Sequence, residues 1–290
     1  MTLQKQATII SSCTAFLLIC VKFFVGIFSG SVAILASAID SALDLFASLF
    51  NLFALIKSEK PADFAYNYGR GKIESIASVV EGSVIVASGV FILYESFKKL
   101  WLKGEIIYIN ASLFVMIFSF LITLALVFYL SFIAKKTNNL VIKADALHYK
   151  TDLLSTGAIL LSILIISFSD LHFIDGILGI CIGIYIIFSA FALLKNGIFI
   201  LMDRALDKKI IENINNLLSS KKEIQGFHSL KTRQSGEIYF LEVHLVFKEG
   251  ISLLKAHEIS NNITKDIKKI QGNWEIITHL DPYDDTKGKL

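Results

Sequence analysis

Residues 8–28 read Thr8-Ile-Ile-Ser-Ser-Cys-Thr-Ala-Phe-Leu-Leu-Ile-Cys-Val-Lys-Phe-Phe-Val-Gly-Ile-Phe28. A run of this length matches the roughly 20 helical residues that cross the hydrocarbon core of a membrane. It is too long for the core of a secretion signal, and no small-x-small cleavage site follows it before the next apolar run. We therefore expect a retained membrane helix.

The rest of the chain repeats this character. Apolar residues make up 54% of its 290 positions, the mean hydropathy is +0.63, and only two prolines are present to interrupt long helices. Such a composition is typical of membrane proteins. The sequence predicts six membrane-spanning helices, near residues 8–29, 32–56, 75–97, 107–134, 141–168 and 174–202.

Loop charges predict the orientation, because cytoplasmic loops are rich in Lys and Arg. The connections after the second and fourth spans carry several basic residues, whereas those after the first and fifth carry none. Although Lys98, Lys99 and Lys103 would lie outside, we expect both termini in the cytoplasm.

The net charge is only +3, and no basic stripe with interleaved aromatics predicts nucleic-acid binding.

The character changes at about residue 207, where charged residues become frequent. Helical spacing over 208–219 and 252–269 alternates with strand-like patterns at 227–233, 238–247 and Trp274–His279, the first two strands being joined by a turn at Gln234-Ser235-Gly236. This α-β-β-α-β order predicts a three-stranded sheet covered by two helices. The expected fold is therefore an α-helical membrane protein with six transmembrane helices (residues 1–206), followed by a cytosolic α+β domain (residues 207–290).

Four ionisable residues stand deep inside two predicted spans. Asp40 and Asp44 lie in the second span, and His148 and Asp152 lie in the fifth. Each pair has i, i+4 spacing, which places both side chains on one helix face. The two helices run in opposite directions, and at 1.5 Å per residue all four groups fall near the midplane. Ionisable groups are costly there, which predicts a functional site.

Three carboxylates and one imidazole form a set that Zn²⁺ accepts tetrahedrally. Unoccupied carboxylates in a low-dielectric interior repel one another and take up protons, whereas a divalent cation needs them deprotonated. Metal and protons would therefore compete for one site, which is the physical basis of an antiporter. Asp145, one turn before His148, is either an acceptor that orients it or a solvated residue. Glu81 would line an aqueous cavity rather than bind metal.

The tail holds a second group of candidate ligands. Alternating strand positions share a face, so His279 and Asp281 can bind from one side. Together with the other imidazoles they suffice for one or two zinc-like ions. The candidate ligands are His228, His244, His257, His279 and Asp281. The three cysteines, by contrast, lie in apolar runs without a CxxC pair and predict neither disulfides nor a thiolate site.

Several motifs together resemble the cation diffusion facilitators, and the resemblance covers nearly the whole chain. The membrane half carries Ser31-Val-Ala-Ile-Leu before Asp40-x-x-x-Asp44, then Tyr68-Gly-x-Gly-Lys72-x-Glu74, then Ala144-Asp-Ala-Leu-His148-x-x-x-Asp152. The tail carries Thr232-Arg-Gln-Ser-Gly236 and His279-x-Asp281-Pro282, which resemble bacterial members of the ferrous-iron/zinc efflux type.

The resemblance implies a homodimer in a bacterial plasma membrane that exports metal in exchange for protons. It implies six helices with a cytosolic ferredoxin-like domain. The transport site would fall on the four membrane residues, and a binuclear site bridging the C-terminal domains would fall on the five tail residues. Close relatives also bind metal in the loop after the second helix through one Asp and two His. Here Asp63 matches, but Tyr66 and Arg70 replace the histidines, so we expect no metal site there.

Three alternatives remain open at this point. A His among the ligands favours zinc over manganese but does not separate Zn²⁺ from Fe²⁺ or Cd²⁺. A membrane metal sensor that dimerises through its tail would not need ligands at the midplane. An intramembrane metalloenzyme would need an acid/base group beside an open metal position, for which only Glu81 is available. A metal-efflux transporter, and not an enzyme, is the function that the sequence favours.

Overall fold

The computed structural model describes residues 2–102, 110–169, 173–270 and 272–282. The chain divides into two compact units, residues 1–198 and 199–290. Each unit is built around its own hydrophobic core.

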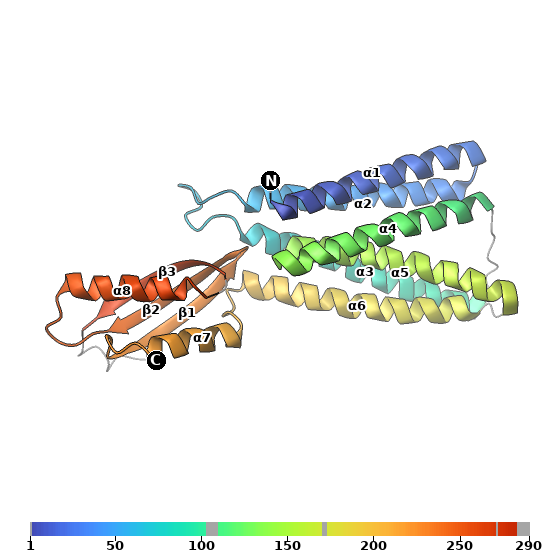
Figure 1. Cartoon of the computed structure of the whole chain (residues 1–290). Helices are drawn as coiled ribbons and strands as arrows, with labels where there is room; N and C mark the ends of the chain where they lie inside the picture. Colours follow the sequence, from blue (N-terminus) through green and yellow to red (C-terminus); the bar gives the residue numbers. More distant parts are fainter. Residues whose placement is uncertain (1, 103–109, 170–172, 271, 283–290) are drawn as a thin grey trace. The chain divides into compact units, whose positions relative to one another are not determined.

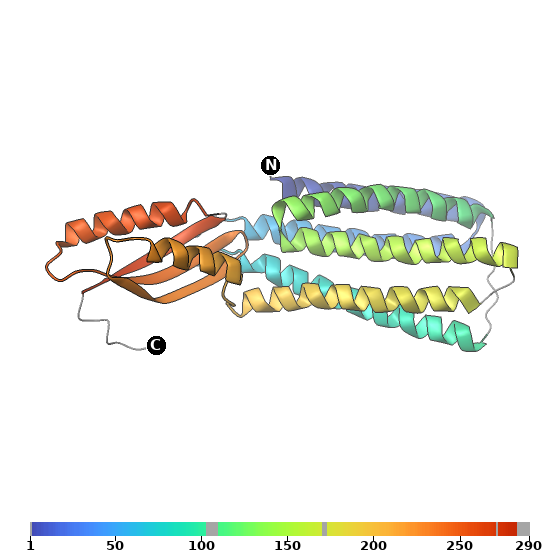
Figure 2. The same ribbon diagram turned by 60° about the horizontal axis from the view of Figure 1, so that its bottom comes forward.

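The first unit is a bundle of long helices (Figures 1 and 2). Each contains a stretch long and apolar enough to cross a membrane. Their bounds are α1 Leu3–Ser29, α2 Val32–Ser58, α3 Lys72–Leu102, α4 Asn110–Thr137, α5 Leu140–Ser169 and α6 Phe173–Leu201. All six expected spans are therefore helical, although residues 107–109 of the fourth lie outside the described part of the chain.

The helices run a few residues past the apolar runs from which they were predicted. At the start of α1 the side chain of Thr2 accepts a hydrogen bond from the Lys5 amide, so the helix begins in polar sequence five residues before the expected position. At the start of α5 the Asn139 side chain caps the amides of Val141 and Ile142. Capping satisfies amides that have no helical partner, whereas hydropathy registers only the stretch inside the membrane.

A tight turn joins α1 to α2. Gly30 adopts the left-handed conformation with φ of 64°, and Ser31 caps α2 by accepting from the Ile34 amide. The two helices are therefore antiparallel neighbours, so that residues equally far from the turn lie at the same depth. Lys22 and Asp40 are each about 12 Å along their helices from this turn at 1.5 Å per residue.

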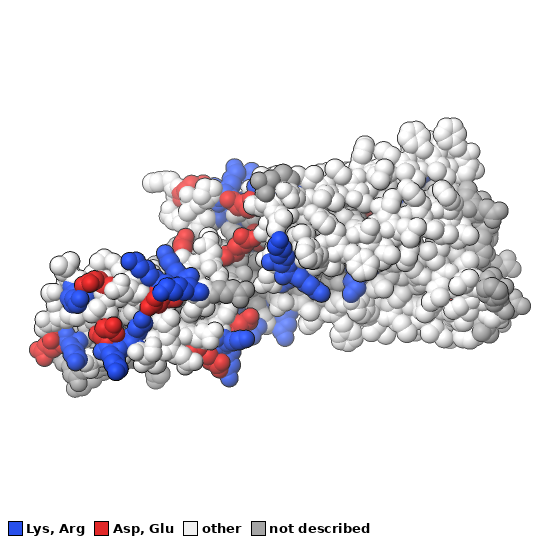
Figure 3. Space-filling model, in the orientation of Figure 1, with Lys and Arg blue, Asp and Glu red and all other residues white. Residues whose placement is uncertain are grey.

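The outer surface of the bundle is apolar over most of its length. Phe28, Phe46 and Phe188 have exposed fractions of 87%, 70% and 73%. In Figure 3, charged side chains of this unit gather at one end, and the remaining surface in view is almost free of them. This is the pattern expected of helices that face lipid, and the chain is a multi-pass membrane protein.

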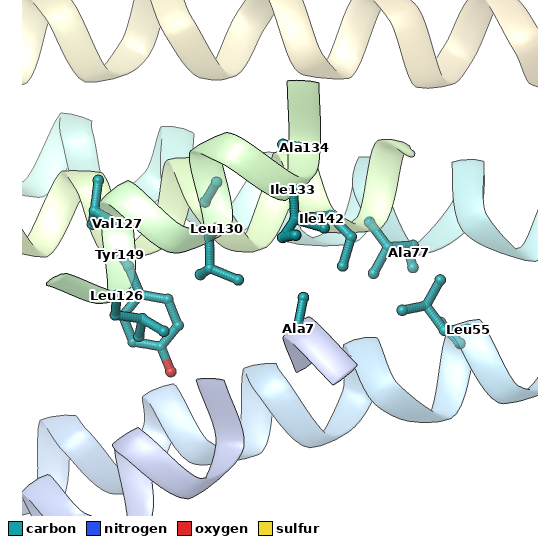
Figure 4. Close-up of a cluster of buried hydrophobic side chains, with 13 residues drawn as sticks. Ala7, Leu55, Ala77, Leu126, Val127, Leu130, Ile133, Ala134, Ile142 and Tyr149 are labelled. Atoms are coloured by element: carbon teal, nitrogen blue, oxygen red, sulfur yellow. The ribbon is translucent and has the colours of Figure 1, made fainter. Parts of the chain in front are cut away.

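The core of the bundle is formed by small and branched side chains from α1 to α5 (Figure 4). Leu55 and Ala77 lie at one end of the cluster, and Leu126 packs near Tyr149 at the other. The Tyr149 ring is buried in this cluster, but its hydroxyl contacts the Ser48 hydroxyl of α2 at 2.8 Å. Tyr149 therefore connects the apolar core to a polar network between the helices.

The second unit has the predicted α-β-β-α-β order. Its elements are α7 Lys208–Ser219, β1 Gly226–Ser235, β2 Ile238–Val246, α8 Leu253–Ile267 and β3 Asn273–Asp281. The sheet order is β1-β2-β3, with β1 antiparallel and β3 parallel to β2. The expected turn is shifted, because strand pairing continues to Ser235 and the chain reverses at Gly236 and Glu237, with Gly236 at φ of 58°.

Both helices of this unit pack on one face of the sheet. Leu241, Val243 and Leu245 alternate along β2 and form a buried cluster with Ile214 of α7 and Ile263 of α8. Because strand side chains alternate between faces, the residues between them, including His244, belong to the opposite face.

Candidate metal centres

Polar residues line one face of α2. Asp40, Asp44, Ser48 and Asn51 recur at spacings of four, four and three residues, which keeps them on one side of a helix. This face packs towards α5, where Asp145, His148, Tyr149 and Asp152 stand. The structure thus brings the two predicted i, i+4 pairs to one helix contact.

Three of the four predicted membrane ligands lie within ligand reach of one another. His148 Nε2 is 3.2 Å from Asp44 Oδ1 and 3.7 Å from Asp152 Oδ2. One ligand atom from each residue lies within 4.8 Å of the other two. Asp40 is one turn away on α2, is exposed and lies outside this three-residue cluster.

One of the candidate ligand atoms lacks a hydrogen-bond partner within the described part of the protein. Asp152 Oδ2 is buried and has no hydrogen-bond partner among the described residues, although it faces the imidazole. A buried carboxylate oxygen without a partner is costly unless another group satisfies it. Two carboxylates converging on one imidazole nitrogen offer a metal ion three ligands of the types that zinc accepts.

A buried polar network begins one turn further along both helices. Asp145 is fully buried and accepts hydrogen bonds from Ser11 at 2.8 Å, Asn51 at 3.3 Å and Ser48 at 3.5 Å. The interpretation of Asp145 as a solvated residue is therefore wrong. Its printed partners come from α1 and α2, and no described hydrogen bond joins it to His148, so its effect on the imidazole is electrostatic.

Glu81 of α3 joins the same network. Its side chain is 5% exposed and accepts from the Asn51 amide at 2.9 Å, while its other oxygen has no partner in the described residues. One amide group thus holds two buried carboxylates, Glu81 and Asp145. Sequence reasoning missed Ser11, Ser48 and Asn51, although the continuation of the Asp40 and Asp44 face to Ser48 and Asn51 was a readable signal.

A lysine from α1 lies near the candidate ligands of the membrane unit. Lys22 Nζ donates to Ser41 Oγ at 2.7 Å and to the Ser37 carbonyl at 3.3 Å, both on α2. Ser41 directly follows Asp40 and lies one turn before Asp44. The ammonium interacts electrostatically with Asp44, Asp152 and Asp40. Nothing in the sequence around Lys22 predicted a role for it.

The second candidate centre is a row of histidines across the sheet. His228 pairs with His244 between β1 and β2, and His244 pairs with His279 between β2 and β3. Directly paired residues share a face, so the three imidazoles stand side by side on the face opposite the helices. Their ring centroids are 4.9 Å and 4.6 Å apart.

Asp281 is the centre of this row. One of its oxygens lies 2.9 Å from His244 Nδ1 and 3.0 Å from His228 Nε2, and the other lies 2.9 Å from His279 Nε2. The carboxylate is 2% exposed, and His228 Nε2 makes no hydrogen bond despite the short distance. Only the His244 contact is a hydrogen bond, whereas His228 Nε2 and the second Asp281 oxygen have no hydrogen-bond partner among the described residues, and imidazole with carboxylate suits zinc.

His257 lies apart from this row within one chain. It is exposed on α8, and α8 covers the other face of the sheet. The cluster of metal-ligating groups among the described residues of this unit consists of His228, His244 and Asp281; it includes neither His257 nor His279, although His279 contacts Asp281.

The loop between α2 and α3 is closed by an ion pair. Arg70 Nη2 lies 2.5 Å from Asp63 Oδ2, and its guanidinium stacks on the Tyr66 ring at 4.2 Å. The Arg70 hydrogen bond holds the pKa of the Asp63 carboxyl below its usual range, so the carboxylate is charged. The three positions at which the resemblance would place a loop metal site therefore contact one another directly, with a guanidinium as the cation.

Comparisons with known proteins identify the family to which both units are similar. A family described as the cation efflux transmembrane domain matches residues 8–202, and one described as the cytoplasmic domain of cation efflux proteins matches residues 206–283. The cation-efflux pumps FieF of Shigella boydii serotype 18 and of Klebsiella pneumoniae are both 32% identical over 280 residues. The matches cover 97% of this chain and 93% of each relative.

Two solved structures of CzrB, one of them in a zinc form, also match part of the chain. They are 25% identical to it, with TM-scores of 0.26 and 0.28, and cover 27% and 30% of this chain and 98% and 99% of their own.

Proposed function

This chain belongs to the cation diffusion facilitator family, as a relative of the ferrous-iron/zinc efflux type, and from that premise we propose that it exports Zn²⁺ in exchange for protons. Two expectations are confirmed by this membership. The chain is a divalent-cation efflux transporter, and it is not an enzyme. The ion, the exchange with protons and the ligands form our proposal.

The convergence of Asp44, His148 and Asp152 carries the proposal. We assign these three residues as transport ligands, with Asp40 one turn away as the fourth. An imidazole with carboxylates favours Zn²⁺ over the harder Mn²⁺, with Fe²⁺ and Cd²⁺ as further substrates that the same donors accept. Because the ligands bind metal only when deprotonated, arrival of the cation expels protons from them.

The proposed orientation follows from the loop charges. The basic loops and both termini would face the cytoplasm of a bacterium, with the six helices in its plasma membrane. Residues 1–206 would form the transport domain, and residues 207–290 would form the metal-binding cytoplasmic domain of a homodimer. There His228, His244, His279 and Asp281 would hold Zn²⁺, with His257 completing a binuclear site between the two copies.

Metal flux into proteoliposomes tests the function. The purified chain should transport Zn²⁺, and an imposed pH gradient should change the rate. Asp152→Ala should abolish the flux, and His148→Asp should alter the preference among Zn²⁺, Cd²⁺, Fe²⁺ and Mn²⁺. Asp207→Ala is a matched control, because Asp207 precedes α7 and makes no capping hydrogen bond. Full flux in Asp152→Ala would refute the site, and indifference to the gradient would refute proton exchange.

The same assay separates a transporter from a sensor. Asp44→Ala should abolish flux while leaving metal binding by the cytoplasmic cluster intact. A sensor would show no flux in the wild-type chain, and its metal-dependent dimer response would survive Asp44→Ala.

A further inference from the structure

Lys22 is a positive charge inside a membrane helix that the transport chemistry described above does not use. A lysine at this depth is costly and usually extends its flexible stem towards the nearest interface. Here the ammonium instead points to α2, where Ser41 Oγ at 2.7 Å and the Ser37 carbonyl at 3.3 Å hold it. The described ion pairs do not include Lys22, so no single carboxylate neutralises it.

The position of this charge relative to the ligands is fixed by two helices. Lys22 and Asp40 lie at the same distance from the α1–α2 turn, and Ser41 lies between Asp40 and Asp44 in the sequence. The carboxylates with which the ammonium interacts electrostatically are Asp44, Asp152 and Asp40. These are the three carboxylates that we assign to the metal.

Counting charges shows what the lysine changes. Three ionised carboxylates carry three negative charges, and the imidazole binds metal in its neutral form. With Lys22 beside them, the group carries two net negative charges, which is the charge of one divalent cation. Without Lys22, a bound divalent cation would leave one negative charge uncompensated in a low-dielectric region, where such an imbalance is expensive.

We propose that Lys22 is the resident counter-ion of the transport site: its fixed charge matches the site to a divalent cation and keeps the binding weak enough for release. The proposal rests on the transport function proposed above. The Lys22 ammonium repels a metal ion bound to the neighbouring carboxylates. This repulsion weakens metal binding and speeds dissociation. It also makes the site less attractive to trivalent cations, which three uncompensated carboxylates would favour.

Steady-state flux in proteoliposomes of the full-length chain tests this assignment. Lys22→Met should lower the KM for Zn²⁺ roughly tenfold to a hundredfold, about 1.4 to 2.8 kcal/mol, because it removes a positive charge that repels the bound cation. The maximal rate should fall as well, because release becomes slow. Lys22→Arg keeps the charge and should retain both constants within about threefold, roughly 0.65 kcal/mol.

Inhibition of Zn²⁺ flux by Tb³⁺ provides a second measurement. It would not change if Lys22 only supported the shape of the site. Tb³⁺ should block Zn²⁺ flux at lower concentrations in Lys22→Met than in the wild type, and Lys22→Arg should behave like the wild type. Lys135→Met is the matched control, because Lys135 is exposed in the last turn of α4. Where methionine prevents folding, Lys22→Gln takes its place, since it keeps a donor for Ser41.

Three outcomes would overturn the assignment while the wild-type chain still transports zinc. The first is an unchanged KM and rate in Lys22→Met. The second is a raised KM, which would mean that Lys22 only supports the shape of the site. The third is equal damage in Lys22→Arg, which would mean that geometry and not charge matters. Absence of wild-type flux would refute the proposed function instead.

Discussion

Among single residues, Asn51 has the most demanding position in the bundle. Its side-chain amide donates to Glu81 at 2.9 Å and to Asp145 at 3.3 Å, so one group binds two buried carboxylates from different helices. An amide has only two such hydrogens, and both are in use. Asn51 therefore connects α2 to α3 and α5 close to the proposed transport ligands.

Replacing Asn51 by Leu should destabilise the protein strongly. Both carboxylates would lose a donor, and a buried polar group left unsatisfied costs about 1–3 kcal/mol, more when it is charged. Thermal unfolding in detergent should show a clearly lower midpoint. Asn213→Ala is the control, since Asn213 is exposed on α7. A midpoint unchanged in Asn51→Leu would mean that the carboxylates find other donors.

Among the elements, α3 and α6 approach each other through glycines. A Cβ placed on Gly183 would lie 2.8 Å from the Leu93 side chain and 3.2 Å from the Gly89 carbonyl oxygen. Small residues allow helix backbones to come this close in a membrane, where van der Waals contact is a main source of association. The buried residues Ile85 and Ile186 complete the same contact.

Gly183→Val should force these two helices apart. The carbonyl of Gly89 is backbone and cannot move aside alone, so overpacking by about 1–3 kcal/mol is expected. The midpoint of thermal unfolding and the rate of zinc flux should both fall. Gly226→Ala should leave both unchanged, because nothing lies within 4 Å of a Cβ at Gly226. Normal stability in Gly183→Val would show that α6 can be displaced without cost.

In the C-terminal unit, an ion pair connects the end of α7 with α8. Hydrogen bonds from Lys221 and Lys269, each at 2.6 Å, hold the pKa of the Asp266 carboxyl at about 2, below its usual 3.8. Because the folded pKa lies below the unfolded one, acid protonates the unfolded chain first. The stabilisation is complete above pH 3.8 and is lost as the pH falls through about 2.

Asp266→Asn should therefore lower the free energy of unfolding near neutral pH but not in acid. We expect the difference in unfolding free energy from the parent chain to be small, since the pair is partly exposed, to shrink as the pH falls from about 4, and to vanish below about pH 2. Fluorescence of Trp274 reports this in a Trp101→Phe background. Glu223→Gln serves as a control, because Glu223 is exposed. A difference that did not shrink between about pH 4 and pH 2 would contradict this account.

At the scale of the whole molecule, the sequence could predict the elements better than the sites between them. Length and hydropathy are local properties, so six helices and the α-β-β-α-β order were readable, and α7 was predicted with its observed bounds. The i, i+4 pairs of Asp40 and Asp44 and of His148 and Asp152 were also readable. Helix ends were not, because they depend on single capping side chains such as Thr2.

The rest depended on contacts between distant segments. His228, His244 and His279 become neighbours only through strand register, which the histidines alone do not specify. The burial of Asp145 depends on Ser11, 134 residues away, and the role of Lys22 depends on how α1 lies against α2. Composition cannot reveal such pairings, because the residues next to each of these side chains in the sequence do not show which distant residue it contacts.

The ion pair between Asp63 and Arg70 has a consequence for how the protein meets a changing metal supply. A loop held closed by a bound metal ion opens when the concentration of that ion is low. A guanidinium is covalently part of the chain and cannot dissociate. The loop between α2 and α3 should thus stay closed at both low and high metal concentrations. Chelators should leave its protease sensitivity unchanged. Any threshold at which export begins is then set elsewhere in the molecule.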